Sequence, residues 1–264
     1  MLLAFVFLVH ASVRAAPPLE RCGPPALLPA YAHNDYRNQR PLLDAIELGF
    51  RGVEADLFRV GTELLVGHGR GELRPSRTLA QLYLEPLQRR KRSCGHVLPD
   101  STPFLLNIEL KDADSVAFRL LASELLVYEE LFQAATPTSP PAVQVTLVGW
   151  WPKSDSTASW PLFLKVHAPL DRDAGRGEPA LRSRVALVSI DYGKAIRWPG
   201  QGPIPRGVRE LLARARQHAA SYGAPIRVHH VPQQQRIYAW LLSEGVTLIG
   251  AEDLRRTRAL LEGI

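Results

Sequence analysis

Short apolar runs alternate with amphipathic stretches from Ala26 to the end of the chain. The runs rich in Val, Ile, Leu and Phe predict eight strands. These are Ala26–Ala32, Gly52–Phe58, Phe104–Leu110, Val143–Val148, Leu162–Val166, Val185–Ile190, Ile226–His230 and Thr247–Ile249. Helical spacing is found in Leu42–Leu48, Leu79–Arg90, Ser115–Phe132, Val208–Ser221, Arg236–Ser243 and Arg255–Leu261.

The alternation of these strands and helices predicts parallel βαβ units, the basis of an α/β fold. Eight strands, most of them followed by a helix, favour a closed TIM (β/α)8-type barrel over an open sheet. The middle connections, residues 150–184, are rich in Pro, Ser, Gly and charged residues and show no helical period. The chain of 264 residues has the length of one barrel, which takes about 250 residues. We therefore expect a single barrel domain over residues 17–264.

The N-terminus resembles a secretory signal. Leu2–Val9 is a short apolar run, and Val13-Arg14-Ala15 provides a signal-peptidase site. The run is far too short to cross a bilayer, which takes about 20 apolar residues. We therefore expect a signal peptide over residues 1–16 and a secreted or periplasmic protein. Export would permit a disulfide between Cys22 and Cys94, the two cysteines of the chain.

The chain carries a formal net charge of +6. Such a charge is compatible with nucleic acid, anionic lipid or a phosphorylated substrate. The basic residues are scattered, apart from Arg89-Arg90-Lys91-Arg92 at the end of a predicted helix, and no nucleic-acid motif accompanies them. Nucleic acid is therefore not expected as a partner.

Acidic side chains follow a period of two at the ends of two predicted strands. Glu54 and Asp56 fall on one face of the second strand, and Glu109 and Lys111 on one face of the third. Taken alone, each pair also fits a solvated strand end. The carboxyl ends of barrel strands converge on one mouth, however, where active sites lie. Three carboxylates gathered there would bind a hard cation, Mg²⁺ or Ca²⁺, beside a lysine for an anionic substrate.

Two histidines lie at strand-to-loop junctions, His33 in Ala32-His33-Asn34-Asp35-Tyr36 and His68 in Gly67-His68-Gly69. A lone histidine is usually structural, but two that flank a carboxylate cluster are typical of an acid/base pair. Weaker candidates at the same mouth are Lys165, His167, Asp191, His229 and Glu252, with Trp150 and Trp151 for an apolar part of a substrate.

The stretch from Ala30 to Leu87, together with Glu109 and Lys111, resembles the glycerophosphodiester phosphodiesterase family, within the phosphatidylinositol-phospholipase-C-like barrels. In that family a His ends the first strand, Glu-x-Asp ends the second, another His follows a short hairpin, and Glu with a nearby Lys ends the third. The His-Asn-Asp-Tyr at residues 33–36 is most similar to the subgroup typified by the altered inheritance of mitochondria proteins.

The resemblance implies the roles of the site residues. Glu54, Asp56 and Glu109 would hold Ca²⁺ or Mg²⁺. His33 and His68 would be the general base and the general acid, and the resemblance leaves open which of them has which role. Lys111 and Asn34 would contact the substrate phosphate. A neighbouring substrate hydroxyl would attack the phosphorus and give a cyclic phosphate, which water then opens.

Three departures from the family leave the substrate open. Asn34 replaces the usual Arg, Gly69 replaces the usual Asp, and the last strand ends in Ala-Glu-Asp.

The implied function is metal-dependent hydrolysis of a small phosphodiester or a phospholipid headgroup, a step of lipid metabolism. It leaves room for peripheral membrane contact and requires no obligate protein partner. Two other functions stay open: a phospholipase D-like lyase that stops at the cyclic phosphate, and a non-catalytic barrel that binds phosphorylated ligands. Paired histidines argue against the last, since a binding module needs no proton donors.

Overall fold

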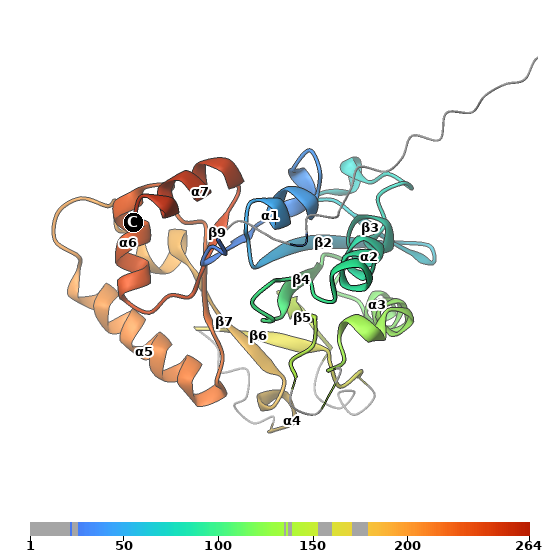
Figure 1. The fold of residues 1–264 in the computed structure, drawn as a ribbon. Coiled ribbons are helices and arrows are strands. Elements are labelled where there is room, and N and C mark those ends of the chain that lie inside the picture. Colours follow the sequence, from blue (N-terminus) through green and yellow to red (C-terminus); the bar gives the residue numbers. More distant parts are fainter. Residues whose placement is uncertain (1–21, 23–25, 135, 137–138, 153–159, 171–178) are drawn as a thin grey trace, which may run out of the picture.

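Each parallel strand pairs with a neighbour on either side, so the sheet closes into a barrel (Figure 1). The computed structural model describes residues 22, 26–134, 136, 139–152, 160–170 and 179–264. Within them one nine-stranded sheet runs β1-β9-β8-β7-β6-β5-β4-β2-β3, and β1 also pairs with β2. Because β3 pairs only with β2, and antiparallel, the other eight strands form a closed parallel barrel.

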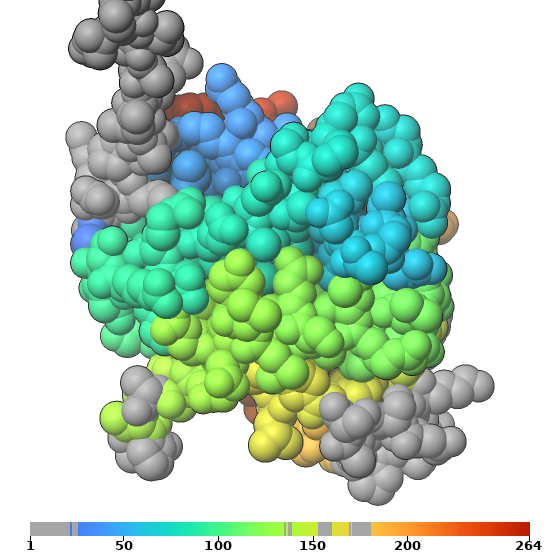
Figure 2. Space-filling model, turned by 90° about the vertical axis from the view of Figure 1, so that its right-hand side faces the viewer, coloured from blue at the N-terminus to red at the C-terminus, as the bar shows by residue number. Residues whose placement is uncertain are grey.

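The strands are β1 Ala30–Ala32, β2 Gly52–Val60, β3 Glu63–Val66, β4 Phe104–Leu110, β5 Val143–Val148, β6 Lys165–Pro169, β7 Val185–Asp191, β8 Ile226–His229 and β9 Leu248–Ala251. The helices are α1 Leu43–Glu47, α2 Glu85–Cys94, α3 Ser115–Val127, α4 Pro179–Arg182, α5 Arg206–Tyr222, α6 Gln235–Ser243 and α7 Leu254–Glu262. On the side shown in Figure 2, the chain from the β2–β3 hairpin to α3 (cyan to green) forms one continuous face.

The structure confirms the predicted barrel, and β4 and β5 have the predicted bounds. The fifth strand begins later than predicted, because a turn closed by Leu164 N and Pro161 O precedes it and leaves Leu162 86% exposed. The prediction missed β3, which extends β2 through a hairpin turned at Gly61 with φ +61°. It also missed the short α4 in the irregular middle.

Two apolar layers hold the barrel together. The outer one lies between strands and helices and includes most buried side chains. The inner one is small and consists of Tyr31, Leu187 and Leu248, with Leu105 packed against them. Tyr31 fits there because position 250 is glycine, where a Cβ atom would lie 2.7 Å from the Tyr31 hydroxyl. The apolar layer closes the barrel interior beneath the polar residues of the strand ends.

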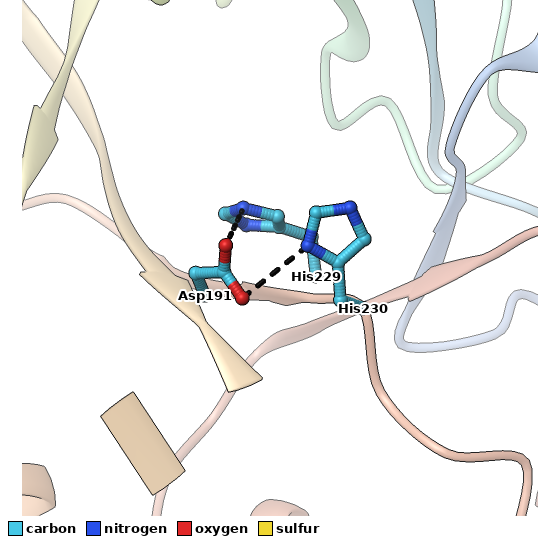
Figure 3. Close-up of side chains that lie close together, drawn as sticks. All are labelled: Asp191, His229 and His230. Atoms are coloured by element: carbon cyan, nitrogen blue, oxygen red, sulfur yellow. Dashed lines mark ion pairs between the residues drawn. The ribbon is translucent and has the colours of Figure 1, made fainter. Parts of the chain in front are cut away.

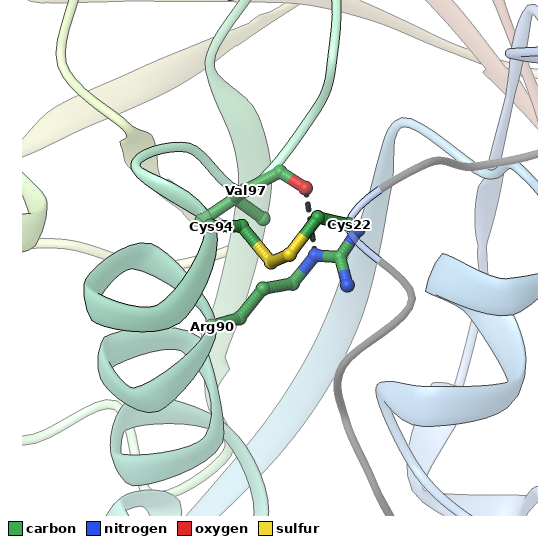
Figure 4. Close-up of a disulfide and its surroundings, with 4 residues drawn as sticks. All are labelled: Cys22, Arg90, Cys94 and Val97. Carbon is green, nitrogen blue, oxygen red and sulfur yellow. Dashed lines mark hydrogen bonds between the residues drawn. A yellow bond between two sulfur atoms is a disulfide. The ribbon is translucent and has the colours of Figure 1, made fainter.

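A disulfide joins Cys22 to Cys94, with 5.3 Å between the Cα atoms (Figure 4). It connects the segment before β1 to the last residue of α2, away from the carboxyl ends of the strands. Beside it, Arg90 Nε donates to the Val97 carbonyl oxygen at 2.8 Å. The bond closes a loop of 72 residues, for which chain entropy gives about 4 kcal/mol of stabilisation.

The predicted signal peptide, residues 1–16, lies outside the described residues. In the described part of the chain, no helix combines the length and the apolar character needed to cross a membrane.

Candidate active site

Three carboxylates meet at the carboxyl ends of β2 and β4. One oxygen of each of Glu54, Asp56 and Glu109 lies within 4.8 Å of the others. The parallel register places Asp56 directly opposite Glu109. The Glu54 and Asp56 residues are only 4% and 1% exposed. Because buried like charges repel and lose hydration, this cluster requires cations.

Two basic side chains partly meet that requirement. Arg227 Nη1 donates to Glu54 Oε2 at 2.5 Å, and its Nε donates to Ser189 Oγ at 2.9 Å. Lys111 Nζ lies 3.0 Å from an Asp56 oxygen and 3.1 Å from a Glu109 oxygen. Burial lowers the pKa of Lys111, but the two carboxylates raise it by more, so the amine stays charged.

The charges nevertheless do not balance, because three carboxylates face two cations. Burial raises the pKa of Glu109 above its usual value; Lys111 opposes this rise, and the charges of Asp56 and Glu54 add to it. One negative charge in excess is therefore removed either by a proton on Glu109 or by a bound cation.

One atom of the cluster fits a bound cation directly. Asp56 Oδ1 is buried and has no hydrogen-bond partner among the described residues, whereas Oδ2 is contacted by Tyr36, His68 and Lys111. Buried polar atoms without a partner are rare. A cation among the three carboxylates would satisfy Oδ1, and an oxygen-only donor set suits Mg²⁺ or Ca²⁺. These residues fit a divalent ion.

His68 lies beside this cluster, two residues beyond the end of β3. Its Nδ1 is 3.2 Å from Asp56 Oδ2 and 3.1 Å from the Tyr36 hydroxyl. The same hydroxyl donates to Asp56 Oδ2 at 2.8 Å. Nε2 of His68 has no hydrogen-bond partner in the part of the chain that the structure describes, and half of the side chain is exposed. The ring is therefore held through Nδ1 and leaves Nε2 available.

His33 lies on the other side of the cluster, just after β1. Its Nε2 is 3.7 Å from Glu54 Oε1, and its Nδ1 is 3.3 Å from Glu252 Oε1. Asn34 Nδ2 is also 3.3 Å from Nδ1, while Asn34 Oδ1 lies 2.7 Å from the Tyr36 hydroxyl. Asn34 has a left-handed backbone, φ 51°, and its side chain is buried. The Asn34 side chain therefore links the two histidines. It contacts His33 directly, and it contacts Tyr36, which in turn contacts His68.

The weaker candidates divide into two groups. His229 and Glu252 lie near His33, with 6.0 Å between the His33 and His229 ring centroids, and Asp191 lies next to His229 (Figure 3). His167 accepts from Gly149 N at 3.1 Å and has Trp151 against its ring.

Lys165 does not lie at the carboxyl end of a strand as the sequence predicts, because it is the first residue of β6. Trp150 lies two residues beyond the end of β5. Burial lowers the pKa of Lys165 below its usual value, and Trp150 packs against the outer core.

Three residues of this mouth had no predicted role: Tyr36, Arg227 and His230. Tyr36 belongs to the His-Asn-Asp-Tyr motif, and Arg227 shares a strand face with His229, so both left a signal in the sequence. His230 left none, because strand alternation would place it on the face opposite His229.

Known proteins resemble this chain in sequence and in fold. The AIM6-like phosphodiesterase domain family matches residues 26–94, which include His33, Glu54, Asp56 and His68 but not Glu109. Altered inheritance of mitochondria protein 6 of Eremothecium gossypii is 28% identical over 273 residues, or 87% of this chain and 68% of that protein. Its homolog from Arthroderma benhamiae is 38% identical over 66 residues, 23% of this chain and 21% of that protein.

Solved structures support the barrel. Glycerophosphodiester phosphodiesterase from Agrobacterium tumefaciens gives a TM-score of 0.50 at 14% identity, covering 89% of this chain and 99% of that one. A tryptophan synthase α-subunit mutant from Pyrococcus furiosus gives 0.52 at 14% identity, covering 90% and 98%. At such identities the likeness shows the fold alone.

The relatives also correct one prediction. A secreted or periplasmic location was expected, but the matching proteins are named for the inheritance of mitochondria, which are organelles inside cells. The prediction of a secreted protein is therefore wrong.

The predicted family is confirmed by the domain match, the relatives and the barrel fold. The chain thus resembles the glycerophosphodiester phosphodiesterase-like barrels and, among them, the altered inheritance of mitochondria proteins.

Proposed function

We propose that this chain is a metal-dependent phosphodiesterase that acts on glycerophosphodiesters or on lysophospholipid headgroups. The observation that carries the proposal is the meeting of Glu54, Asp56 and Glu109 between two histidines at one barrel mouth. A non-catalytic binding barrel would need neither the uncompensated charge nor the available imidazole. The chain's resemblance to phosphodiesterases supports the same reaction class.

The carboxylates would hold Mg²⁺ or Ca²⁺, which when bound supplies charge to polarise the phosphoryl oxygens. Lys111 bridges Asp56 and Glu109 and would add its own charge beside a phosphate. Asn34 in this arrangement contacts His33 and Tyr36, so it would reach a phosphate only by giving up one of these contacts.

His68 is suited to the role of general base. Asp56 Oδ2 accepts from Nδ1–H, which fixes the tautomer and leaves the lone pair of Nε2 for a substrate hydroxyl. Tyr36 holds the same ring from a second side. The arrangement orients the base without blocking the nitrogen that takes the proton.

His33 is suited to the role of general acid. The Asn34 amide, donating to Nδ1, directs the proton of the neutral ring to Nε2, the nitrogen that faces Glu54. The Glu252 carboxylate beside Nδ1 would stabilise a second proton. A leaving group above the cluster would receive the proton from Nε2, while the attacking hydroxyl loses its own to His68.

A pocket of about 630 Å³ opens beside His33 and provides room for a polar substrate. Its lining includes Gln233, Gln234, Arg256 and Glu252. These side chains suit a glycerol or headgroup portion rather than an acyl chain. We therefore place the polar end of the substrate here, with any lipid tail outside the barrel at a membrane surface.

Metal dependence is the first prediction. Removing the cation with excess chelator should abolish turnover, and Glu109→Gln or Asp56→Asn should do the same while leaving the circular dichroism spectrum unchanged. Turnover is measured on a phosphodiester panel with Mg²⁺ or Ca²⁺ restored. Full activity of metal-free protein in chelator would contradict the role of the cluster.

A stability prediction concerns Glu54, which both faces the metal position and neutralises buried Arg227. Glu54→Gln should lower the free energy of unfolding by about 3 to 5 kcal/mol, because it leaves a buried guanidinium without its partner. The double variant Glu54→Gln/Arg227→Met should recover most of that loss. Urea denaturation measures both, and equal stability of Glu54→Gln and wild type would show that the pair is not needed.

The histidines give a third prediction. His33→Ala and His68→Ala should each reduce turnover by roughly 100-fold or more, the range for general acid–base groups. The double variant should be little worse than either single one, because groups that act together are non-additive. His218→Ala on α5 is the matched control and should retain wild-type rates. A near-normal rate in either single variant would remove that residue from the pair.

A further inference from the structure

A second group of potential metal ligands lies at the same mouth, outside the carboxylate cluster. Asp191 ends β7, and His229 and His230 come from the end of β8 and the residue after it (Figure 3). One ligand atom of each lies within 4.8 Å of the others. The two histidine rings lie next to each other, and each faces a different oxygen of the Asp191 carboxylate. Two imidazoles and one carboxylate form a donor set that transition metals prefer.

The side chains of these two histidines lie close together, although consecutive residues of a regular strand point to opposite faces. Consecutive strand residues point to opposite faces, so His229 and His230 should diverge. His230 instead adopts a left-handed conformation, φ 54°, which is uncommon for a residue other than glycine. Its ring consequently lies 4.8 Å from that of His229, and its Nδ1 is 3.3 Å from Asp191 Oδ1. Backbone outliers of this kind gather at functional sites.

Two of the distances between the donor atoms are close to those around a small ion. His230 Nδ1 is 3.3 Å from one Asp191 oxygen, and His229 Nε2 is 3.7 Å from the other. Ligands about 2.0–2.1 Å from a tetrahedral ion are separated by roughly 3.3 Å, so donor atoms that lie within 4.8 Å of one another would move closer together on binding the ion. An all-oxygen site for Mg²⁺ or Ca²⁺ would not use imidazole nitrogen.

We propose that Asp191, His229 and His230 form a second metal site, for a transition-metal ion of the Zn²⁺ type. Three protein ligands leave the fourth tetrahedral position open, as catalytic zinc sites do. His33 lies next to it, with its ring centroid 5.2 Å from that of His230, and both line the 630 Å³ pocket. The open position therefore takes an anionic oxygen of a molecule bound in that pocket.

The surrounding charges permit such an ion. Arg227 lies on the same strand face as His229, but it is paired with Glu54. Lys194 contacts Asp191 Oδ2 at 3.2 Å, yet its side chain is 83% exposed and can turn away into solvent. Glu252, beside His33, adds a negative charge to the pocket. The ion would thus compete with one exposed lysine ammonium and with the Lys194 backbone N–H, which donates to Asp191 Oδ1 at 3.2 Å.

Cobalt(II) is the probe, because its visible absorption reports tetrahedral coordination. The full-length protein, stripped with chelator and supplied with millimolar Mg²⁺ for the carboxylate cluster, should bind Co²⁺ with an intense tetrahedral spectrum that Zn²⁺ abolishes. Asp191→Asn and His230→Asn should each weaken Co²⁺ binding by roughly 100-fold or more, since even residues behind the ligands are worth 10- to 100-fold. Asn at position 230 tolerates the left-handed backbone.

Two control variants distinguish metal binding at this second site from metal binding at the carboxylate cluster. His218→Ala removes a histidine of α5, and Asp56→Asn disables the carboxylate cluster; both should retain the cobalt spectrum. The second site is overturned if wild-type protein gives no tetrahedral spectrum, if Asp191→Asn and His230→Asn bind Co²⁺ as wild type does, or if Asp56→Asn alone abolishes binding. None of these readouts requires the protein to turn over a substrate.

Discussion

The mouth of this barrel is organised around negative charge that is buried before any substrate arrives. Glu54 and Asp56 have almost no contact with solvent, and Glu109 lies opposite Asp56 in the next strand. Such a cluster is stable only if cations reach it from other parts of the fold. Arg227 does so from the far side of the barrel, 173 residues later in the chain, and Lys111 from the same strand as Glu109. Barrel closure allows the Arg227 contact, whereas Lys111 reaches the cluster because β4 pairs directly with β2.

The same constraint places the histidines. His68 contacts Asp56 and His33 faces Glu54, so each imidazole is held by a carboxylate that also faces the metal position. Tyr36 contacts Asp56, His68 and Asn34, and Asn34 contacts His33. A change at one of these residues should therefore disturb both histidines. The proposed acid–base groups and metal ligands therefore form one connected network, in which Glu54 is joined to the others through its 3.7 Å contact with His33.

Local sequence patterns were enough to predict most of the fold. The apolar runs of β4 and β5 gave their bounds, and period-two alternation placed Glu54, Asp56 and Glu109 together. What the patterns lacked was information on which side chains meet across the closed barrel. Arg227 shows up in the sequence only as a charged residue in a short strand, and its pairing with Glu54 depends on β8 lying across the barrel.

His230 was not predicted as a site residue for a different reason. Its position depends on a left-handed backbone conformation, which no local sequence pattern indicates. The fifth strand was misplaced because the apolar Leu162 lies in an exposed turn rather than in the sheet. In each case a tertiary or backbone constraint outweighed the local hydrophobic pattern.

The central claim is that this mouth cleaves phosphodiesters, and phosphorus NMR of the intact protein with glycerophosphodiesters and lysophospholipids tests it most directly. With Mg²⁺ or Ca²⁺ present, the account predicts a new phosphomonoester resonance, preceded by a cyclic phosphate, and neither should form in chelator. A cyclic phosphate that accumulates without opening would identify a lyase working through the same groups. Unchanged spectra for every diester, from folded protein with metal bound, would contradict the account.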